Sequence, residues 1–259
     1  MVENTDILGV RIFKGNLRET LELFTHWIET KQKRRVCVLP VNCILWATAN
    51  ESLKELYNTS DLNVADGVPV VWASRFLNNP IKGRVTGLDI LPAFAEIAYK
   101  KNFTFFLLGA KEGVAEELAA KLNQDHPGIR ILGVYSPPFA ERFSDEENRK
   151  MVDMINAVKP NVLWVSLTAP KQDKWINEFI GQLDVNIAIG VGGAFEVTAG
   201  LIKRAPKWMQ KNGLEWLFRF SQEPKRLFKR YFVEAPVFVP MVIRQKFKNL
   251  FKTPENRKL

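Results

Sequence analysis

The sequence predicts an α/β fold, a Rossmann-like and mostly parallel sheet with helices on both faces, followed by a C-terminal helical appendage. Three observations support this prediction. Apolar runs of strand length alternate with segments of helical periodicity. The strands are apolar throughout, which is typical of parallel strands covered on both faces. The composition changes near Gly200, where basic and aromatic residues become frequent. We therefore expect an α/β core over residues 1–199 and an appendage over residues 200–259.

The first hundred residues begin the alternation of strands and helices. Leu17, Leu21, Phe24 and Ile28 recur at helical spacing, and a charged turn separates them from the first apolar run. The predicted elements are, in order, a helix over 16–30, a strand over 36–41, a helix over 45–57, a strand over 62–65, and helices over 69–77 and 88–100.

The following hundred residues continue the same pattern. Ser144 precedes a helical segment, and Glu147 three residues later completes the signature of a capping box. The Ala169-Pro170 pair marks the start of another helix. The predicted elements are a strand over 103–108, a helix over 113–122, a strand over 129–134, a helix over 144–158, a strand over 162–167, a helix from 169–170 onward, and a strand over 185–189.

The carboxyl ends of these strands are the expected ligand-binding edge, as in other open α/β sheets. Asp66 is the only carboxylate directly after a strand and before a glycine, and a partly desolvated carboxylate there suits a general base. A helix cap or Asx-turn is the competing interpretation, and position alone favours it. The polar and glycine segments expected at this edge are Asn42, Asp66-Gly67, Gly109, 168–172 and 190–195.

Other residues near this edge suit anionic ligands. Gly192 and Gly193 suit backbone contacts to a diphosphate at a helix N-terminus, with tight strand-to-helix packing as the alternative. The third glycine of a G-x-G-x-x-G pattern is replaced by Phe195, so a nicotinamide-dependent oxidoreductase is weakly supported. Arg84 suits phosphate or sugar, or a surface ion pair. Lys171 offers a cation at a helix start, although a solvated lysine is the usual outcome.

The C-terminal segment concentrates positive charge. Residues 200–259 hold 15 of the 37 basic and 4 of the 28 acidic residues, so residues 1–199 carry a net charge of −2. On a helical wheel, Lys225, Arg226, Lys229 and Arg230 fall opposite a set of aromatic and leucine side chains. Such a helix suits an anionic membrane surface, a nucleic acid, or the protein's own core. The nearby tryptophans and phenylalanines favour the membrane, and packing of these aromatic residues across a homo-oligomer interface stays open.

The remaining composition narrows the classes of function. Two cysteines, Cys37 and Cys43, form no disulfide framework, and no segment has the length or character of a signal peptide or a bilayer span. We therefore expect a cytoplasmic protein with peripheral membrane contact. His26 and His126 lie far apart in the sequence and no D-x-D motif occurs, so we expect no metal site, no Ser-His-Asp triad and no cofactor.

Several ordered motifs together resemble the WecG/TagA/CpsF family of bacterial glycosyltransferases, glycosyltransferase family 26. The resemblance extends from about Val36 to Tyr231. The matching segments are residues 66–73 (DGVPVVWA), 84–89 (RVTGLD), 169–175 (APKQDKW), 190–195 (GVGGAF), 204–210 (RAPKWMQ), 213–216 (GLEW) and 222–224 (QEP).

The resemblance implies a metal-independent, inverting transferase that uses a nucleotide-sugar donor, usually a UDP-sugar, and a polyprenyl-diphosphate-linked acceptor. Such enzymes build surface polysaccharides or teichoic acid, with N-acetylmannosamine, its uronic acid, glucose or galactose as the sugar. Asp66 matches the family's proposed base, and the appendage is implied to complete the site and attach the enzyme to the membrane. The other matching site residues are Asn42 in the active site, Arg84 and Gln172 in the donor pocket, and Arg219, Arg226 and Lys229 at the diphosphates.

The chain departs from the family pattern at a few positions. Pro40 stands where threonine is usual, and it lacks a hydroxyl that would contact sugar or phosphate. Thr168, Asp173 and Glu196 replace a frequent glycine, glutamate and aspartate. These differences leave the donor sugar open.

Overall fold

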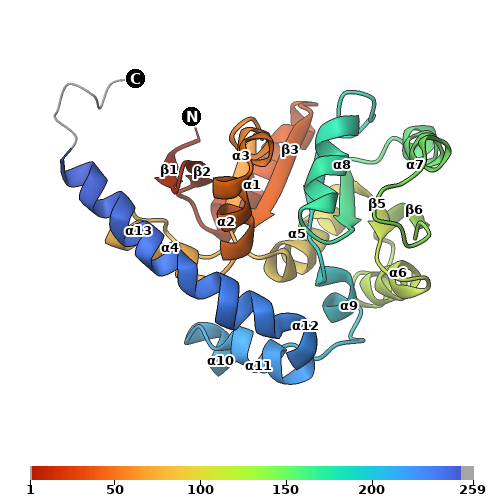
Figure 1. Cartoon of the computed structure of the whole chain (residues 1–259). Coiled ribbons are helices and arrows are strands. Elements are labelled where there is room, and N and C mark those ends of the chain that lie inside the picture. Colours follow the sequence, from red (N-terminus) through yellow and green to blue (C-terminus); the bar gives the residue numbers. More distant parts are fainter. Residues whose placement is uncertain (1, 252–259) are drawn as a thin grey trace.

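A computed structural model describes residues 2–251, apart from the side chains of Lys211 and Arg226. Within these residues the core is a six-stranded, all-parallel sheet with the strand order β4-β3-β8-β7-β5-β6. Helices cover both faces of the sheet, and the C-terminal helices lie at the end toward which β3 points (Figure 1). The predicted α/β class and its helical appendage are confirmed.

The elements follow the predicted alternation. The strands are β1 Asn4–Ile7, β2 Val10–Phe13, β3 Arg34–Leu39, β4 Leu62–Ala65, β5 Thr104–Gly109, β6 Arg130–Tyr135, β7 Val162–Ser166 and β8 Ile187–Gly190. The helices of the core are α1 Leu17–Glu29, α2 Val41–Ala49, α3 Glu51–Asn58, α4 Val68–Phe76, α5 Gly87–Lys101, α6 Val114–Asp125, α7 Asp145–Val158, α8 Lys171–Phe179 and α9 Ala194–Thr198. Those of the appendage are α10 Lys207–Lys211, α11 Glu215–Gln222, α12 Pro224–Phe228, a π-helical turn η1 Lys229–Glu234, and α13 Ala235–Leu250.

Alternate residues of the central strands face opposite sides of the sheet, where the buried side chains form one cluster on the first face and two on the second. In β7, Val162 and Trp164 face a core shared with α1, α5, α6 and α9, whereas Leu163 and Val165 face α7 and α8. On that second face, β3 and β4 pack against α2, α3, α4, the β1–β2 hairpin and α13. Burial on both faces explains why the strands are apolar throughout. Phe238 and Val242 join this last cluster, so the end of the chain is fixed to the core by apolar contacts.

Two local features differ from the sequence-based predictions. The N-terminal residues form the antiparallel β1–β2 hairpin, which was not predicted; Leu8 and Gly9 both have positive φ at its turn. The single helix expected over residues 45–57 is instead two helices, because Asn50 leaves the helical conformation. Its side chain accepts a hydrogen bond from the backbone N–H of Leu53 at 3.0 Å and so caps α3.

The capping box predicted at Ser144 is only half formed. The Ser144 hydroxyl accepts a hydrogen bond from the backbone N–H of Glu147 at 3.1 Å. The Glu147 carboxylate does not return to the cap, because it accepts a hydrogen bond from the Tyr135 hydroxyl at 2.6 Å. This bond ties α7 to the edge strand β6. A complete capping box is present at Asn16 and Glu19 instead.

The appendage segment with the predicted cationic and aromatic faces is not a regular α-helix. The π-helical turn η1 interrupts the helix between α12 and α13 and changes the direction in which successive side chains point. Leu227 is buried, whereas Phe228 and Phe232 on the predicted apolar face are 55% and 47% exposed. Arg230 is partly buried while Lys229 is exposed. Lys229 and Arg230 therefore differ in their exposure to solvent.

Candidate active site

Three neighbouring strands, β4, β3 and β8, bring the predicted polar residues to one edge of the sheet. Asp66 follows β4, and its backbone N–H donates to the carbonyl of Leu39 at the end of β3 at 3.1 Å. Asn42 lies in the first turn of α2, directly after β3, and Gly192 and Gly193 follow β8. Residues far apart in the sequence thus meet at this edge, because parallel strands all end on the same side.

Asn42 presents an unsatisfied polar atom at this edge. Its side chain is 5% exposed, and its Oδ1 atom has no hydrogen-bond partner among the described residues. A buried amide oxygen without a partner is costly, and it commonly marks a place where a ligand or water supplies the donor. Pro40 is the residue before α2, and it contributes no side-chain hydrogen bond to the helix.

Gln172 holds the glycine turn in place. Its Oε1 atom accepts a hydrogen bond from the backbone N–H of Gly192 at 3.0 Å, and the Ser166 hydroxyl donates to the Gly192 carbonyl at 2.7 Å. A Cβ atom at Gly190 would lie 2.7 Å from the Gln172 side chain, so only glycine leaves room for it. Gln172 is itself buried, and the N–H of Gly192 is already engaged.

Arg219 of α11 reaches this glycine turn from the appendage. A Cβ atom at Gly193 would lie 2.7 Å from its Nη2 atom and 3.8 Å from Oε2 of Glu196. The guanidinium therefore rests on the bare backbone of Gly193, beside Glu196. That Glu196 oxygen is buried without a hydrogen-bond partner among the described residues. A cation is thus held where the turn after β8 meets the appendage.

The charged arginines of the appendage act electrostatically on Asp66. Burial raises the pKa of Asp66 above its ordinary value, and Arg230 and Arg219, followed by Arg84, oppose this rise by favouring the carboxylate. Arg230 belongs to η1, which lies against α2. The carboxylate at the sheet edge and the cations of the appendage therefore converge on one place.

A sequence model described as the glycosyl transferase WecG/TagA/CpsF family matches residues 5–252. The chain belongs to this family. It is therefore a glycosyltransferase, and its chemistry is that of a hexosyltransferase. Proteins of Staphylococcus aureus strains MW2 and NCTC 8325 are each 29% identical over 245 residues, covering 94% of this chain and 93% of theirs. Both are named N-acetylglucosaminyldiphosphoundecaprenol N-acetyl-beta-D-mannosaminyltransferase.

A closed ring of ion pairs joins the appendage of this glycosyltransferase to its core. Glu215 of α11 accepts hydrogen bonds from Arg84 Nη1 at 2.5 Å and from Arg204 Nε at 2.8 Å. Arg204 Nη2 donates to Asp89 at 2.7 Å, and Asp89 lies 3.9 Å from Arg84 Nη2. The core supplies Arg84 and Asp89, and the residues beyond position 200 supply the other two. Arg84, predicted in the donor pocket, therefore already has an acidic partner from the appendage.

The other predicted cations are less closely tied to the site. Lys229 is exposed at the start of η1, and the side chain of Arg226 lies outside the described part of the chain. Lys171, expected in solvent, instead donates to the Ala140 carbonyl and lies 3.5 Å from the centre of the Phe143 ring. Burial lowers its pKa. The loop that contains Ala140 and Phe143 thus partly shields Lys171 from solvent.

Two residues of this site were not identified from sequence. Arg230 was predicted only as part of the cationic face suited to anionic headgroups, without a role at the site. Glu215 appeared only as part of the GLEW motif, without a role. The pairing of Glu215 with Arg84 and Arg204 has no local signal in the sequence, because Glu215 is 131 and 11 positions away from them.

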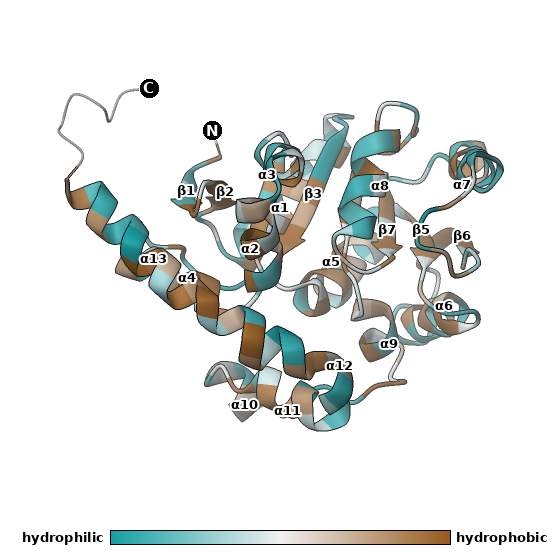
Figure 2. Ribbon diagram, in the orientation of Figure 1, coloured by the Kyte–Doolittle hydropathy of each residue, from teal (hydrophilic) through white to brown (hydrophobic). Residues whose placement is uncertain are grey.

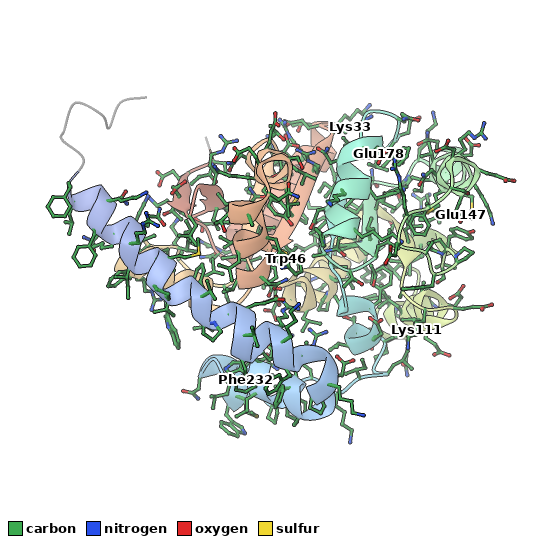
Figure 3. All side chains as sticks on the ribbon, viewed as in Figure 1. Lys33, Trp46, Lys111, Glu147, Glu178 and Phe232 are labelled. Atoms are coloured by element: carbon green, nitrogen blue, oxygen red, sulfur yellow. The ribbon has the colours of Figure 1, made fainter. Side chains whose placement is uncertain are left out.

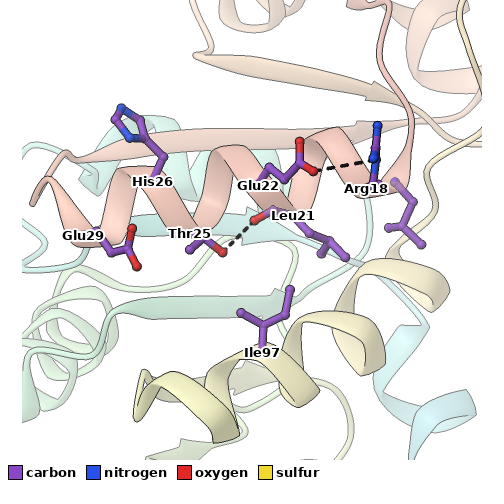
Figure 4. A pocket seen from close by; sticks show the side chains of 8 residues that line it. Arg18, Leu21, Glu22, Thr25, His26, Glu29 and Ile97 are labelled. Carbon is purple, nitrogen blue, oxygen red and sulfur yellow. Dashed lines mark hydrogen bonds and ion pairs between the residues drawn. The ribbon is translucent and has the colours of Figure 1, made fainter.

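A surface groove lies between α1 and α5, away from the predicted site residues (Figure 4). It has a volume of about 420 Å³ and an apolar floor of Leu17, Leu21 and Ile97. At its rim, Arg18 pairs with Glu22 at 3.7 Å. None of the predicted site residues lines it. We therefore assign the active site to the sheet edge and not to this groove.

Proposed function

We propose that this enzyme transfers a hexose from a UDP-sugar to a hydroxyl of a polyprenyl-diphosphate-linked saccharide, with inversion at the anomeric carbon. The observation that carries the proposal is the arrangement at the carboxyl edge of the sheet. Asp66 follows β4, the Arg219 guanidinium lies against Gly193 after β8, and the turn η1 that contains Arg230 packs against α2. A direct displacement needs a base to receive the proton of the attacking hydroxyl. It also needs fixed cations to stabilise the diphosphate that leaves.

In the proposed step, Asp66 takes the proton of the acceptor hydroxyl as its oxygen attacks the anomeric carbon. The bond between that carbon and the β-phosphate oxygen breaks, and UDP leaves with the bonding electron pair. Arg219 and Arg230, with Arg84, stabilise the charge that develops on the diphosphate, without a metal ion. Asn42 donates its amide or accepts through its free oxygen at a sugar hydroxyl.

For the sugar itself, we propose N-acetylmannosamine, and N-acetylglucosamine on a polyprenyl diphosphate as the acceptor. The names of the staphylococcal relatives support this choice, because the similarity covers 94% of the chain. Pro40 is the departure most relevant to donor choice. A panel of UDP-sugars carrying N-acetylmannosamine, its uronic acid, glucose and galactose tests the proposed donor. Preferential transfer of a sugar other than N-acetylmannosamine would show that this part of the proposal is wrong.

The base is tested with Asp66→Asn, which keeps the shape of the side chain and removes its basicity. We expect kcat to fall at least 100-fold, the order of general-base catalysis, with UDP binding retained. Asp153→Asn, on the exposed side of α7, is the matched control. Because burial raises the pKa of Asp66, wild-type activity should rise with pH through a value above that of an ordinary aspartate. Near-wild-type turnover by Asp66→Asn removes Asp66 from this role.

We further propose that the appendage holds the enzyme on the cytoplasmic face of an anionic membrane, where the lipid-linked acceptor resides. Among residues 2–251, no helix is long and apolar enough to cross a bilayer. Hydrophobic residues recur along α13 (Figure 2), and those exposed in the appendage include Trp208, Val237, Val239, Phe247 and Phe251. Large exposed apolar side chains beside lysines suit an interfacial position.

Sedimentation with phosphatidylglycerol vesicles tests this attachment. We expect the variant Phe247→Ser/Phe251→Ser to bind at least about 30-fold more weakly, since each substitution removes more than about 1 kcal/mol of apolar transfer free energy. Phe139→Ser is the control, because Phe139 is fully exposed on a loop of the core. Equal sedimentation of the two variants would show that the appendage is not the membrane contact.

A further inference from the structure

A cleft of about 610 Å³ lies between α4 and α10, next to the proposed active site. Its walls come from both parts of the chain: Trp72, Arg75 and Arg84 from the core, and Lys207, Gln210 and Asn212 from the appendage. Arg84 lies in the wall of this cleft and also acts on the pKa of Asp66. The cleft therefore opens beside the position assigned to the reacting groups.

The cleft carries unbalanced positive charge. Arg84 is paired with Glu215 at 2.5 Å. Arg75 and Lys207 are exposed, and none of the ion pairs among the described residues includes either of them. Two uncompensated cations, from α4 and from α10, face one cavity. Cations in this arrangement are typical of a phosphate site.

An apolar surface continues from the charged cleft. Trp72 and Phe76 lie one turn apart on α4 and are 57% and 48% exposed. Lys246 of α13 lies 5.6 Å from the centre of the Phe76 ring, so this strip reaches the long C-terminal helix. A ligand that suits both features has an anionic head and an apolar chain.

We propose that this cleft binds the lipid-linked acceptor, with Arg75 and Lys207 on its diphosphate and Trp72 and Phe76 along its first isoprenoid units. This inference rests on the proposed function for the identity of the acceptor. The donor diphosphate then lies on the other side of Arg84, toward Arg219 and Gly193. Placing the two diphosphates on separate cations leaves the acceptor sugar between them, within reach of Asp66.

The charged part is tested with Arg75→Gln/Lys207→Gln, and Lys33→Gln is the matched control. Lys33 is exposed at the end of the molecule opposite α10 (Figure 3). We expect the KM for acceptor to rise at least 10-fold, because each charge-assisted hydrogen bond contributes about a factor of ten or more. The KM for the UDP-sugar should change less than about 2-fold. A higher donor KM with an unchanged acceptor KM would assign the cleft to the donor and overturn the proposal.

Direct binding separates this inference from the proposed function. Farnesyl diphosphate is the probe, and Arg75→Gln/Lys207→Gln should weaken its binding at least about 10-fold. Trp72→Ala should weaken the binding of farnesyl diphosphate and leave the binding of inorganic diphosphate unchanged. If the wild-type enzyme transfers no sugar but these binding effects appear, the proposed function is wrong and the assignment of the cleft as the isoprenoid diphosphate site is retained. If farnesyl diphosphate binds all variants equally, or only binding to anionic vesicles changes, the cleft assignment is wrong.

Discussion

The ring of Arg84, Glu215, Arg204 and Asp89 gives the sharpest prediction for the link between core and appendage. Glu215→Gln keeps the shape of the side chain and removes the charge that two arginines share at 2.5 and 2.8 Å. The side chains are 17% to 23% exposed, between a surface pair and a buried one. Breaking surface pairs costs about 0–1 kcal/mol and breaking buried pairs about 3–5 kcal/mol, so we expect a loss of about 2 kcal/mol.

This loss should appear locally, in the helix that carries Glu215. Amide hydrogen exchange of α11 should become about 30-fold faster in Glu215→Gln, the factor that corresponds to 2 kcal/mol. Strands β5 and β7, which are interior strands of the sheet, should exchange as in the wild type. Glu178→Gln, an exposed carboxylate on α8 (Figure 3), is the control. Unchanged protection of α11 would refute the assignment of the ring as the link.

The same carboxylate predicts a pH dependence of the link. Burial acts to raise the pKa of Glu215, but the hydrogen bonds from Arg204 and Arg84 outweigh it, and the pKa lies below its ordinary value. A lowered pKa stabilises the folded state above the ordinary glutamate pKa of about 4.3. This contribution is lost as the pH falls through the lower folded-state value. Protection of α11 should therefore fall below about pH 4 in the wild type and show no such loss in Glu215→Gln.

Two further substitutions test the interior of the site. Gly193→Ala should lower kcat about 10-fold with little change in melting temperature, because the new Cβ displaces the end of the Arg219 side chain but meets no backbone; unchanged turnover would show that Arg219 is not needed there. Asp173 is fully buried, with Tyr57 donating a hydrogen bond at 3.2 Å, and burial raises its pKa to about 7. Because the folded protein then holds a proton that the unfolded chain releases, stability to urea should fall as pH rises from about 4 to 7, and Asp173→Asn should remove that slope; equal slopes would contradict it.

The sequence alone predicted the architecture well, and the reason is physical. Six apolar strands between amphipathic helices have few alternatives to a parallel sheet covered on both faces. The same rule placed Asn42, Asp66 and Gly192 at one edge, because parallel strands end on the same side. The order β4-β3-β8, which makes these three strands neighbours, depends on crossovers between distant segments and has no local signal.

Two departures from the predictions arise where a polar side chain forms a hydrogen bond that the sequence pattern did not indicate. Glu147 bonds Tyr135 instead of its own helix cap, and Asn50 divides one predicted helix in two. In the appendage, the charge count near position 200 identified a cationic segment that accompanies a near-neutral core. Only the tertiary structure decided which of these cations lie near the predicted site. Arg230, in the π-helical turn, favours the carboxylate form of Asp66, and Glu215 pairs with Arg84. Both interactions depend on how the appendage packs against the sheet edge, and not on the spacing of residues within the appendage.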